Sequence, residues 1–206
     1  MPIIAKQDSG SHYPQIEAST YQAVCYGVID LGTQYSEQYA KSMRKVLFIW
    51  ELPDERLEVE RDGKIVSLPR VISRQYTLSL HEKSKLYQDL NAWRGIAFTD
   101  EELAGFEVES VISANCMLTV VHNDKGKARV GGVSKLMKNL PKKKAESEKL
   151  YYSIEDHGYV IPEGVPEWIR GIIKESAEHK AVGNAAANPA LTAAHETYVD
   201  DDPIPF

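Results

Sequence analysis

The chain has 206 residues, of which 43% are hydrophobic, and a formal net charge of −6 at pH 7. This length suits one domain with extensions or two small domains, and the apolar fraction is sufficient for a packed core. No apolar run reaches the roughly 20 residues of a membrane helix, and residues 1–14 lack a signal-peptide segment, so we expect a cytoplasmic protein without a membrane partner. Cys25 and Cys116 are too few for a four-ligand zinc site and predict buried free thiols.

The charge is unevenly distributed along the chain. Residues 1–150 contain 21 Lys and Arg against 20 Asp and Glu, whereas residues 151–206 contain 3 against 10. Residues 110–150 alone carry nine basic and three acidic side chains. This asymmetry favours a body that meets an anion and an acidic C-terminal part that meets something else.

The first half of the chain predicts an N-terminal arm followed by strands. Residues 1–18 have no clear periodicity and predict an extended or disordered arm. Three strands rich in β-branched and aromatic residues are predicted over residues 20–31, 43–52 and 71–80. Polar residues 32–42 predict a loop, and Pro53-Asp54 is expected to end the second strand.

Turn and cap signals add a hairpin, two helices and two more strands. Asp62-Gly63 favours a tight turn in a small hairpin over residues 57–66. Ser79 is the expected N-cap of the first helix, and Gly95 is expected to close it. Thr99 and Glu102 have the spacing of a capping box at the start of the second helix. The helices are predicted over residues 81–93 and 99–106, and the strands over residues 116–122 and 127–136.

Five strands with a helix between the third and the fourth have the element order of an OB-fold, a small Greek-key barrel. We therefore predict a mainly β protein with a five-stranded OB-fold barrel over residues 19–138, including the hairpin as an insertion. Residues 139–181 predict a basic linker and one C-terminal helix over residues 167–180, after Pro166. Its apolar stripe is expected to consist of Trp168, Ile169, Ile172 and Ile173. Residues 182–206 predict a flexible Ala- and Asn-rich spacer with an acidic tip.

The sequence contains no recognisable catalytic constellation. The six histidines are scattered and match no metal-ligand spacing, and no glycine-rich phosphate loop is present. We therefore expect a protein that is not an enzyme and that has neither a metal nor a cofactor.

The predicted strands interleave aromatic and basic residues, as single-stranded nucleic-acid binding requires. Flat rings stack on bases, and Lys or Arg neutralise phosphates. Because a strand aromatic is more often a core residue, burial remains the alternative for each ring. Along the third strand, period two places Ser73, Gln75 and Thr77 on one face and Ile72, Arg74 and Tyr76 on the other. Because Arg74 would be unusual at a core position, the Arg74/Tyr76 pair is the best groove candidate. The candidate DNA-binding residues are Tyr26, Arg44, Lys45, Phe48, Trp50, Arg74, Tyr76, Arg129, Lys135 and Lys138.

The last seven residues combine a run of carboxylates with a short apolar hook. Two prolines and three aspartates oppose helix and sheet, so this segment has little to bury by itself. It suits a partner with an apolar pocket surrounded by Lys or Arg, although a solvated, disordered terminus is the simpler alternative. The candidate partner-binding residues are Asp200, Asp201, Asp202, Pro203, Ile204, Pro205 and Phe206.

Two parts of the chain resemble known families. The tip resembles that of bacterial single-stranded-DNA-binding proteins, in which acidic residues run directly into Ile-Pro-Phe, whereas Pro203 intervenes here. The body resembles a family of phage and prophage replication-associated proteins in the segments 76–83, 93–95, 97–99 and 166–169. These resemblances imply an OB-fold single-stranded-DNA-binding protein, encoded by a phage or prophage, that recruits replication and recombination enzymes through its tip.

We therefore expect a protein that coats single-stranded DNA during replication, recombination or repair. Two alternatives remain open: an interaction module that acts through its tail without binding DNA, and a factor that anneals or processes single strands. Because one barrel covers few nucleotides, a homodimer or a cooperative array on DNA is compatible with this role.

Overall fold

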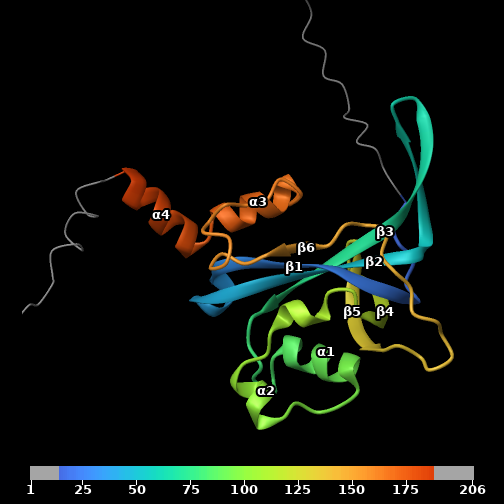
Figure 1. Cartoon of the computed structure of the whole chain (residues 1–206), viewed down its shortest axis with the longest axis horizontal. Coiled ribbons are helices and arrows are strands. Elements are labelled where there is room, and N and C mark those ends of the chain that lie inside the picture. The colour runs from blue at the N-terminus through green and yellow to red at the C-terminus, as the bar shows by residue number, and fades with distance from the viewer. Residues whose placement is uncertain (1–13, 188–206) are drawn as a thin grey trace, which may run out of the picture.

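The computed structural model describes residues 14–187, which form a mainly β body with helices on both sides (Figure 1). Five strands follow the order β3-β2-β1-β4-β5 with antiparallel neighbours, and a sixth strand pairs with β1 in parallel. The strands are β1 (Thr20–Ser36), β2 (Lys41–Arg61), β3 (Lys64–Thr77), β4 (Asn115–His122), β5 (Ala128–Lys135) and β6 (Leu150–Tyr152).

Short helices connect the strands and follow them. Those between β3 and β4 lie on one side of the sheet, and α3 and α4 lie on the other (Figure 1). None of the helices within residues 14–187 has the length and apolar content needed to cross a membrane. The helices are η1 (Glu37–Tyr39), α1 (Lys85–Arg94), α2 (Asp100–Ala104), η2 (Val108–Val111), α3 (Glu167–Lys174) and α4 (Ala177–Ala187).

Much of the predicted element pattern is confirmed. The five predicted strands are present, and α1 lies between the third and the fourth. Gly95 ends α1 in the left-handed conformation, at φ 67°, where a Cβ would add strain. Thr99 and Glu102 form the expected capping box of α2. These features depend on local sequence signals, which is why the pattern predicts them.

The first hairpin differs from its prediction. Most of residues 32–42 is not a loop, because β1 continues to Ser36 and only η1 separates it from β2. Pro53 does not end β2 but lies where the β2–β3 register shifts, between Leu52 and Arg56. A proline lacks the donor for a ladder hydrogen bond, and a register irregularity tolerates that loss.

The helix boundaries also need correction. The N-cap of α1 is Ser84 rather than Ser79, and its side chain accepts a hydrogen bond from the backbone of Tyr87. The single helix predicted over residues 167–180 is two helices, and the hydroxyl of Ser176 accepts from the backbone of His179 in the first turn of α4. Strand β6 was not predicted, since three residues give no period to read.

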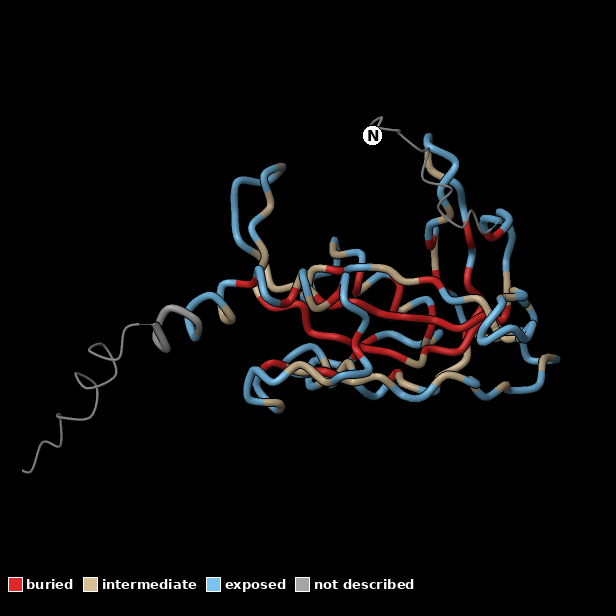
Figure 2. Tube along the Cα trace, turned by 90° about the horizontal axis from the view of Figure 1, so that it is seen from above, coloured by how far each residue is buried: buried red, intermediate tan, exposed pale blue. Residues whose placement is uncertain are grey.

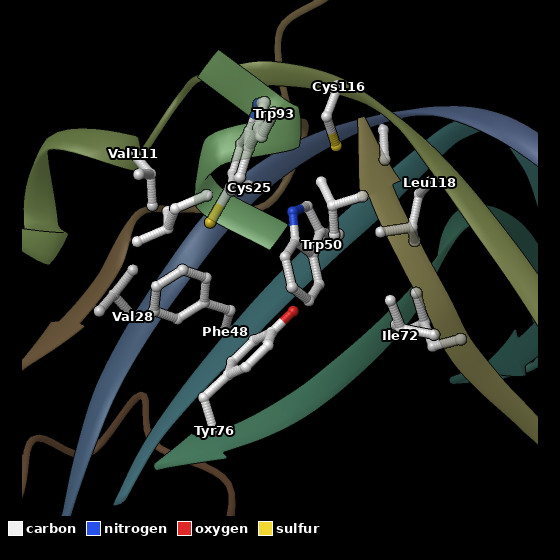
Figure 3. Packing of buried hydrophobic residues seen from close by; sticks show 14 of the residues in the cluster. Cys25, Val28, Phe48, Trp50, Ile72, Tyr76, Trp93, Val111, Cys116 and Leu118 are labelled. Carbon is white, nitrogen blue, oxygen red and sulfur yellow. The ribbon is translucent and has the colours of Figure 1, made fainter. Parts of the chain in front are cut away.

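The interior contains an aromatic-rich first core between the sheet and α1 (Figure 3). Cys25 and Cys116 are free and buried here, as predicted, and burial raises the pKa of the Cys25 thiol to about 12. The largest members of the first core include Phe48, Trp50, Tyr76, Leu86, Leu90 and Trp93.

A second core lies on the opposite face of β1 and β2. It joins these strands to the C-terminal part of the chain and consists of Ile29, Leu31, Leu47, Ile49, Tyr152, Ile154, Val165, Ile169 and Ile173. Strand β2 is therefore buried on both faces in its middle, with alternate residues in each core. Buried backbone runs through the centre of the body, whereas the β2–β3 hairpin is largely exposed (Figure 2).

The basic segment predicted as a linker is held against the sheet. The side chain of Asn115 exchanges two hydrogen bonds with the backbone of Lys143, at 2.8 and 2.9 Å. The fully buried carboxylate of Glu51 accepts from the backbone N–H groups of Glu146 and Ser147, both at 2.8 Å. These charge-assisted bonds fix the path that leads into β6.

Replacing Ile169 by alanine should destabilise the protein by about 2–5 kcal/mol, because it leaves a cavity in the second core. Urea denaturation followed by circular dichroism measures this free energy. Trp168→Ala is the matched control on the same helix, because Trp168 is 56% exposed and should change stability little. Equal stability of the two variants would show that the second core does not support the fold.

Candidate nucleic-acid interface

A groove of about 460 Å³ lies where β2, β3 and β5 approach α3. We call it the seam groove; its lining residues are Leu47, Ser73, Arg74, Gln75, Arg129, Val130 and Trp168. Two arginines and one tryptophan therefore gather beside small polar side chains on one surface. This combination can hold a phosphate and a flat ring at the same time.

The strand register brings the polar side chains into this groove. Gln75 of β3 lies opposite Leu47 of β2, and Ser73 lies opposite Ile49. Since side chains alternate along a strand, Ser73, Gln75 and Thr77 share the face opposite the buried Ile72 and Tyr76, as the sequence predicted.

The aromatic side of the groove comes from α3. Ile169 and Ile173 are fully buried in the second core and fix this helix against the outer face of the sheet. Trp168, the residue before Ile169, lies on a different side of the helix, next to the core. Its side chain is 56% exposed and lines the seam groove. Its ring is the only tryptophan ring with substantial exposure, since Trp50 is 0% and Trp93 is 6% exposed.

Arg74 lies mainly on the inner face of the sheet, the face that also carries Tyr76. Its Nη1 donates to the carbonyl of Val130 at 2.9 Å and lies 3.4 Å from the carboxylate of Asp89. The guanidinium also lies over the ring of Tyr76, at 5.3 Å from the centroid. Because β3 and β5 are the two ends of the strand order, this side chain connects the two edges of the sheet.

Three predicted stacking residues are buried, which corrects their assignment to a DNA surface. Phe48 is 1%, Trp50 0% and Tyr76 3% exposed, and all three point into the first core (Figure 3). The hydroxyl of Tyr76 donates a hydrogen bond to the carboxylate of Asp89 at 2.8 Å. The pKa of Tyr76 is raised, mainly by burial and secondly by the Asp89 carboxylate. A base could reach these rings only if the core opened. The Arg74/Tyr76 pair is therefore a structural pair.

The other predicted residues on the first two strands, Tyr26, Arg44 and Lys45, do not line the seam groove. Lys45 lies two residues before Leu47 on the same face, and it donates to Thr77 at 2.8 Å. Partial burial lowers the pKa of Lys45. Arg44 instead pairs with Asp30 at 2.6 Å and Glu155 at 2.9 Å, so two carboxylates compensate its charge away from the groove.

The hydrogen bond to Asp30 raises the pKa of Arg44, which keeps this guanidinium charged within its ion pairs. Tyr26 is half-buried against the second core, and burial raises its pKa. Neither residue lines the seam groove. Arg129, in contrast, is exposed and lines it from β5.

Lys135 and Lys138 line a different pocket, of about 610 Å³, beside α1. Lys142 and Arg94 contribute to the same pocket, and its floor is apolar. The ten predicted residues therefore do not form one surface. Arg129 and Arg74 meet at the seam groove with Lys45 next to it, and Lys135 and Lys138 form a second basic region.

Sequence reasoning did not identify Trp168 as a candidate binding residue. It assigned Trp168 to one apolar stripe together with Ile169, Ile172 and Ile173. Adjacent positions on a helix differ by about 100° in direction, so Trp168 and Ile169 cannot both face the same narrow core. The sequence signal for an exposed Trp168 was the width of the apolar stripe, which is too large for all four residues to face one narrow core.

The predicted tip, residues 200–206, lies outside the described residues. Within residues 14–187, no group of three or more His, Cys, Asp and Glu side chains is arranged to hold a metal ion. Comparison of the chain with protein-family models, curated proteins and solved structures finds no significant similarity.

Acrylamide should quench the emission of one tryptophan and leave two protected, because only Trp168 is substantially exposed. The expected Stern–Volmer plot curves downward for the native protein and becomes linear in Trp168→Phe, which retains only buried indoles. Efficient quenching of all the emission in Trp168→Phe would contradict the placement of Trp50 and Trp93 in the first core.

Proposed function

We propose that this protein binds single-stranded DNA through the seam groove of an OB-fold barrel and recruits partner enzymes through its acidic tip. The observation that carries the proposal is an exposed tryptophan beside an exposed arginine on the outer face of β3 and β5. The function is non-catalytic, with DNA as the ligand. By its sequence resemblance, the protein would act in a bacterial cytoplasm as a phage or prophage replication protein.

The strand arrangement supports the OB-fold assignment. β1 lies between β2 and β4, while β3 and β5 are the outer strands of the five. An OB-fold is a partly open five-stranded barrel, and closure requires these outer strands to approach each other. The hydrogen bond from Arg74 to the carbonyl of Val130 crosses this gap. Helix α1 follows the third strand, as in the OB-fold order.

The position of the groove also supports the proposal. OB-folds bind oligonucleotides on the face of their second and third strands, and Leu47, Ser73 and Gln75 lie on that face here. The C-terminal segment covers the neighbouring part of the face, over β1 and β2, with the second core. The uncovered part therefore has Trp168 at its border.

The groove chemistry fits a ligand without a fixed base sequence. The indole of Trp168 presents a π-face that any unpaired base can stack on, which contributes roughly 1–3 kcal/mol per base. Arg129 in the groove and Lys45 beside it supply positive charge for phosphates, and Ser73 and Gln75 can hydrogen-bond to sugar or base edges. A duplex has no exposed base face, so single strands should be preferred.

Oligothymidine should quench the fluorescence of Trp168 and bind with a salt-dependent affinity. Trp168→Ala should weaken binding by about five- to 150-fold, the equivalent of one lost stacking contact. Fluorescence anisotropy with labelled oligothymidine at two salt concentrations measures this change. Trp168→Phe should retain most of the affinity, because a phenyl ring also stacks.

Arg129→Gln should reduce the magnitude of the salt slope by about 0.7, as expected for one phosphate contact on a single strand. Lys180→Gln is the matched control, because Lys180 lies on α4 and pairs with Glu175 at 2.6 Å. Unaltered affinity in both Trp168→Ala and Arg129→Gln would exclude the seam groove as the binding site. Absence of any binding at micromolar protein would exclude DNA as the ligand.

Removing residues 200–206 should abolish partner capture and leave oligothymidine binding intact. The physical reason is that the segment supplies three carboxylates and the apolar Ile204 and Phe206 to a basic, apolar pocket of the partner. Pull-down of bacterial replication and recombination enzymes by the full chain, by the truncated chain and by Phe206→Ala measures this effect. Unchanged capture by the truncated chain would refute the recruiting role.

A further inference from the structure

The outer part of the β2–β3 hairpin, residues 56–69, is an arm that projects from the body (Figures 1 and 2). Beyond the register shift at Leu52/Arg56 its two strands pair with each other. No residue of the arm belongs to either hydrophobic core. An isolated two-stranded hairpin is only marginally stable in water. An apolar face on such an arm, outside both cores, therefore needs a physical reason.

The arm has one apolar face, defined by the strand register. Leu57 lies opposite Leu68 and Val59 lies opposite Val66, so these four side chains share a face. The other face carries Glu58 and Glu60 opposite Ser67 and Ile65. Its lower end is tied to the body by the ion pair of Arg56 with Glu146, at 2.5 Å. On the apolar face Val66 is 37% exposed, and Leu57, Val59 and Leu68 are half-buried although they belong to neither core.

The charges on the apolar face are arranged with opposite signs at its two ends. Arg61 lies opposite Lys64 at the tip, next to Asp62, which leaves a net positive charge. Glu55 lies at the base, where burial alternates in step with Leu57 and Val59. Glu17 and Arg70 lie near Glu55 around Tyr21, so the base has a net negative charge.

We propose that the apolar face of the arm is a dimerisation surface whose partner is the same face of a second copy of this chain. In a contact with two-fold symmetry both copies use the same surface, and here the two arms would run in opposite directions. The positive tip of one arm then meets the negative base of the other, and the four aliphatic side chains meet in the middle. This charge pattern is complementary to itself only when the two arms are antiparallel.

The contact is small, with four aliphatic side chains from each copy. A standard interface buries about 800 Å² per partner, and this one is smaller, so the dissociation constant should be on the order of micromolar or weaker. No residue of the arm lines the seam groove, to which Trp168 belongs. Dimerisation is therefore independent of the DNA-binding proposal and can be tested without DNA.

Sedimentation velocity of the full chain across about 1–300 µM, without DNA, should show a reversible monomer–dimer equilibrium. Val66→Lys should weaken the dimer at least tenfold, because it places a cation in the apolar middle of the contact. Ile65→Lys is the matched control: Ile65 is 75% exposed, more than Val66 at 37%, but it lies on the opposite face. The control should dimerise like the unmodified protein.

The charge pattern has a separate test. Glu55→Lys and Arg61→Glu should each weaken the dimer, and the double variant should regain most of the lost affinity, because the exchange restores opposite signs across the contact. A strictly monomeric protein over the whole concentration range would overturn the proposal. So would equal effects of Val66→Lys and Ile65→Lys, or a double variant as weak as the single ones.

One other occupant of the apolar face is distinguishable. The described chain starts at Pro14, whose carbonyl accepts a hydrogen bond from Arg70 at the base of the arm. Residues 1–13 contain Ile3 and Ile4 and are long enough to span the arm. Removal of residues 1–13 should leave the dimer intact or strengthen it. Loss of the dimer on this removal would overturn the proposal in favour of a contact made by the N-terminal residues.

Discussion

The burial of β2 on both faces is the constraint on which the rest of the structure depends. Val46, Phe48 and Trp50 enter the first core, and Leu47 and Ile49 enter the second. An antiparallel strand commonly has one solvent-exposed face, but in β2 the second core covers that face. The C-terminal segment must therefore fold with the sheet, because without it Leu47 and Ile49 would be exposed to water. This is why α3 has a fixed place beside the seam groove.

The same constraint explains which aromatic residues remain available for a ligand. Phe48 and Trp50 lie in the middle of β2, which has no exposed face there, and both are therefore buried. Trp168 lies at the border of the second core, where one side of a helix is covered and the adjacent side is not. The proposed binding surface therefore uses residues at the edge of the packing rather than the strand aromatics themselves.

The sequence was sufficient for features with local causes and insufficient for those that depend on distant contacts. The strands, the Asp62-Gly63 turn and the caps at Gly95 and Thr99 follow from neighbouring residues. The extension of β2 beyond Pro53 depends on its pairing with β3. Strand β6 and the inward direction of Arg74 depend on segments more than fifty residues away. Period two gave Arg74 the same face as Tyr76, but only the structure shows that this face is internal.

The second core also makes the stability and the proposed binding activity separable at neighbouring residues. Ile169 is wholly buried, and Trp168 lines the groove. A change at Ile169 would act on the proposed DNA binding through the population of folded protein, whereas a change at Trp168 would act on the bound state alone. A short helix can serve both purposes because its two sides face different environments. The C-terminal segment therefore completes the fold and, through the next side chain along the helix, contributes the ring on which the proposed activity depends.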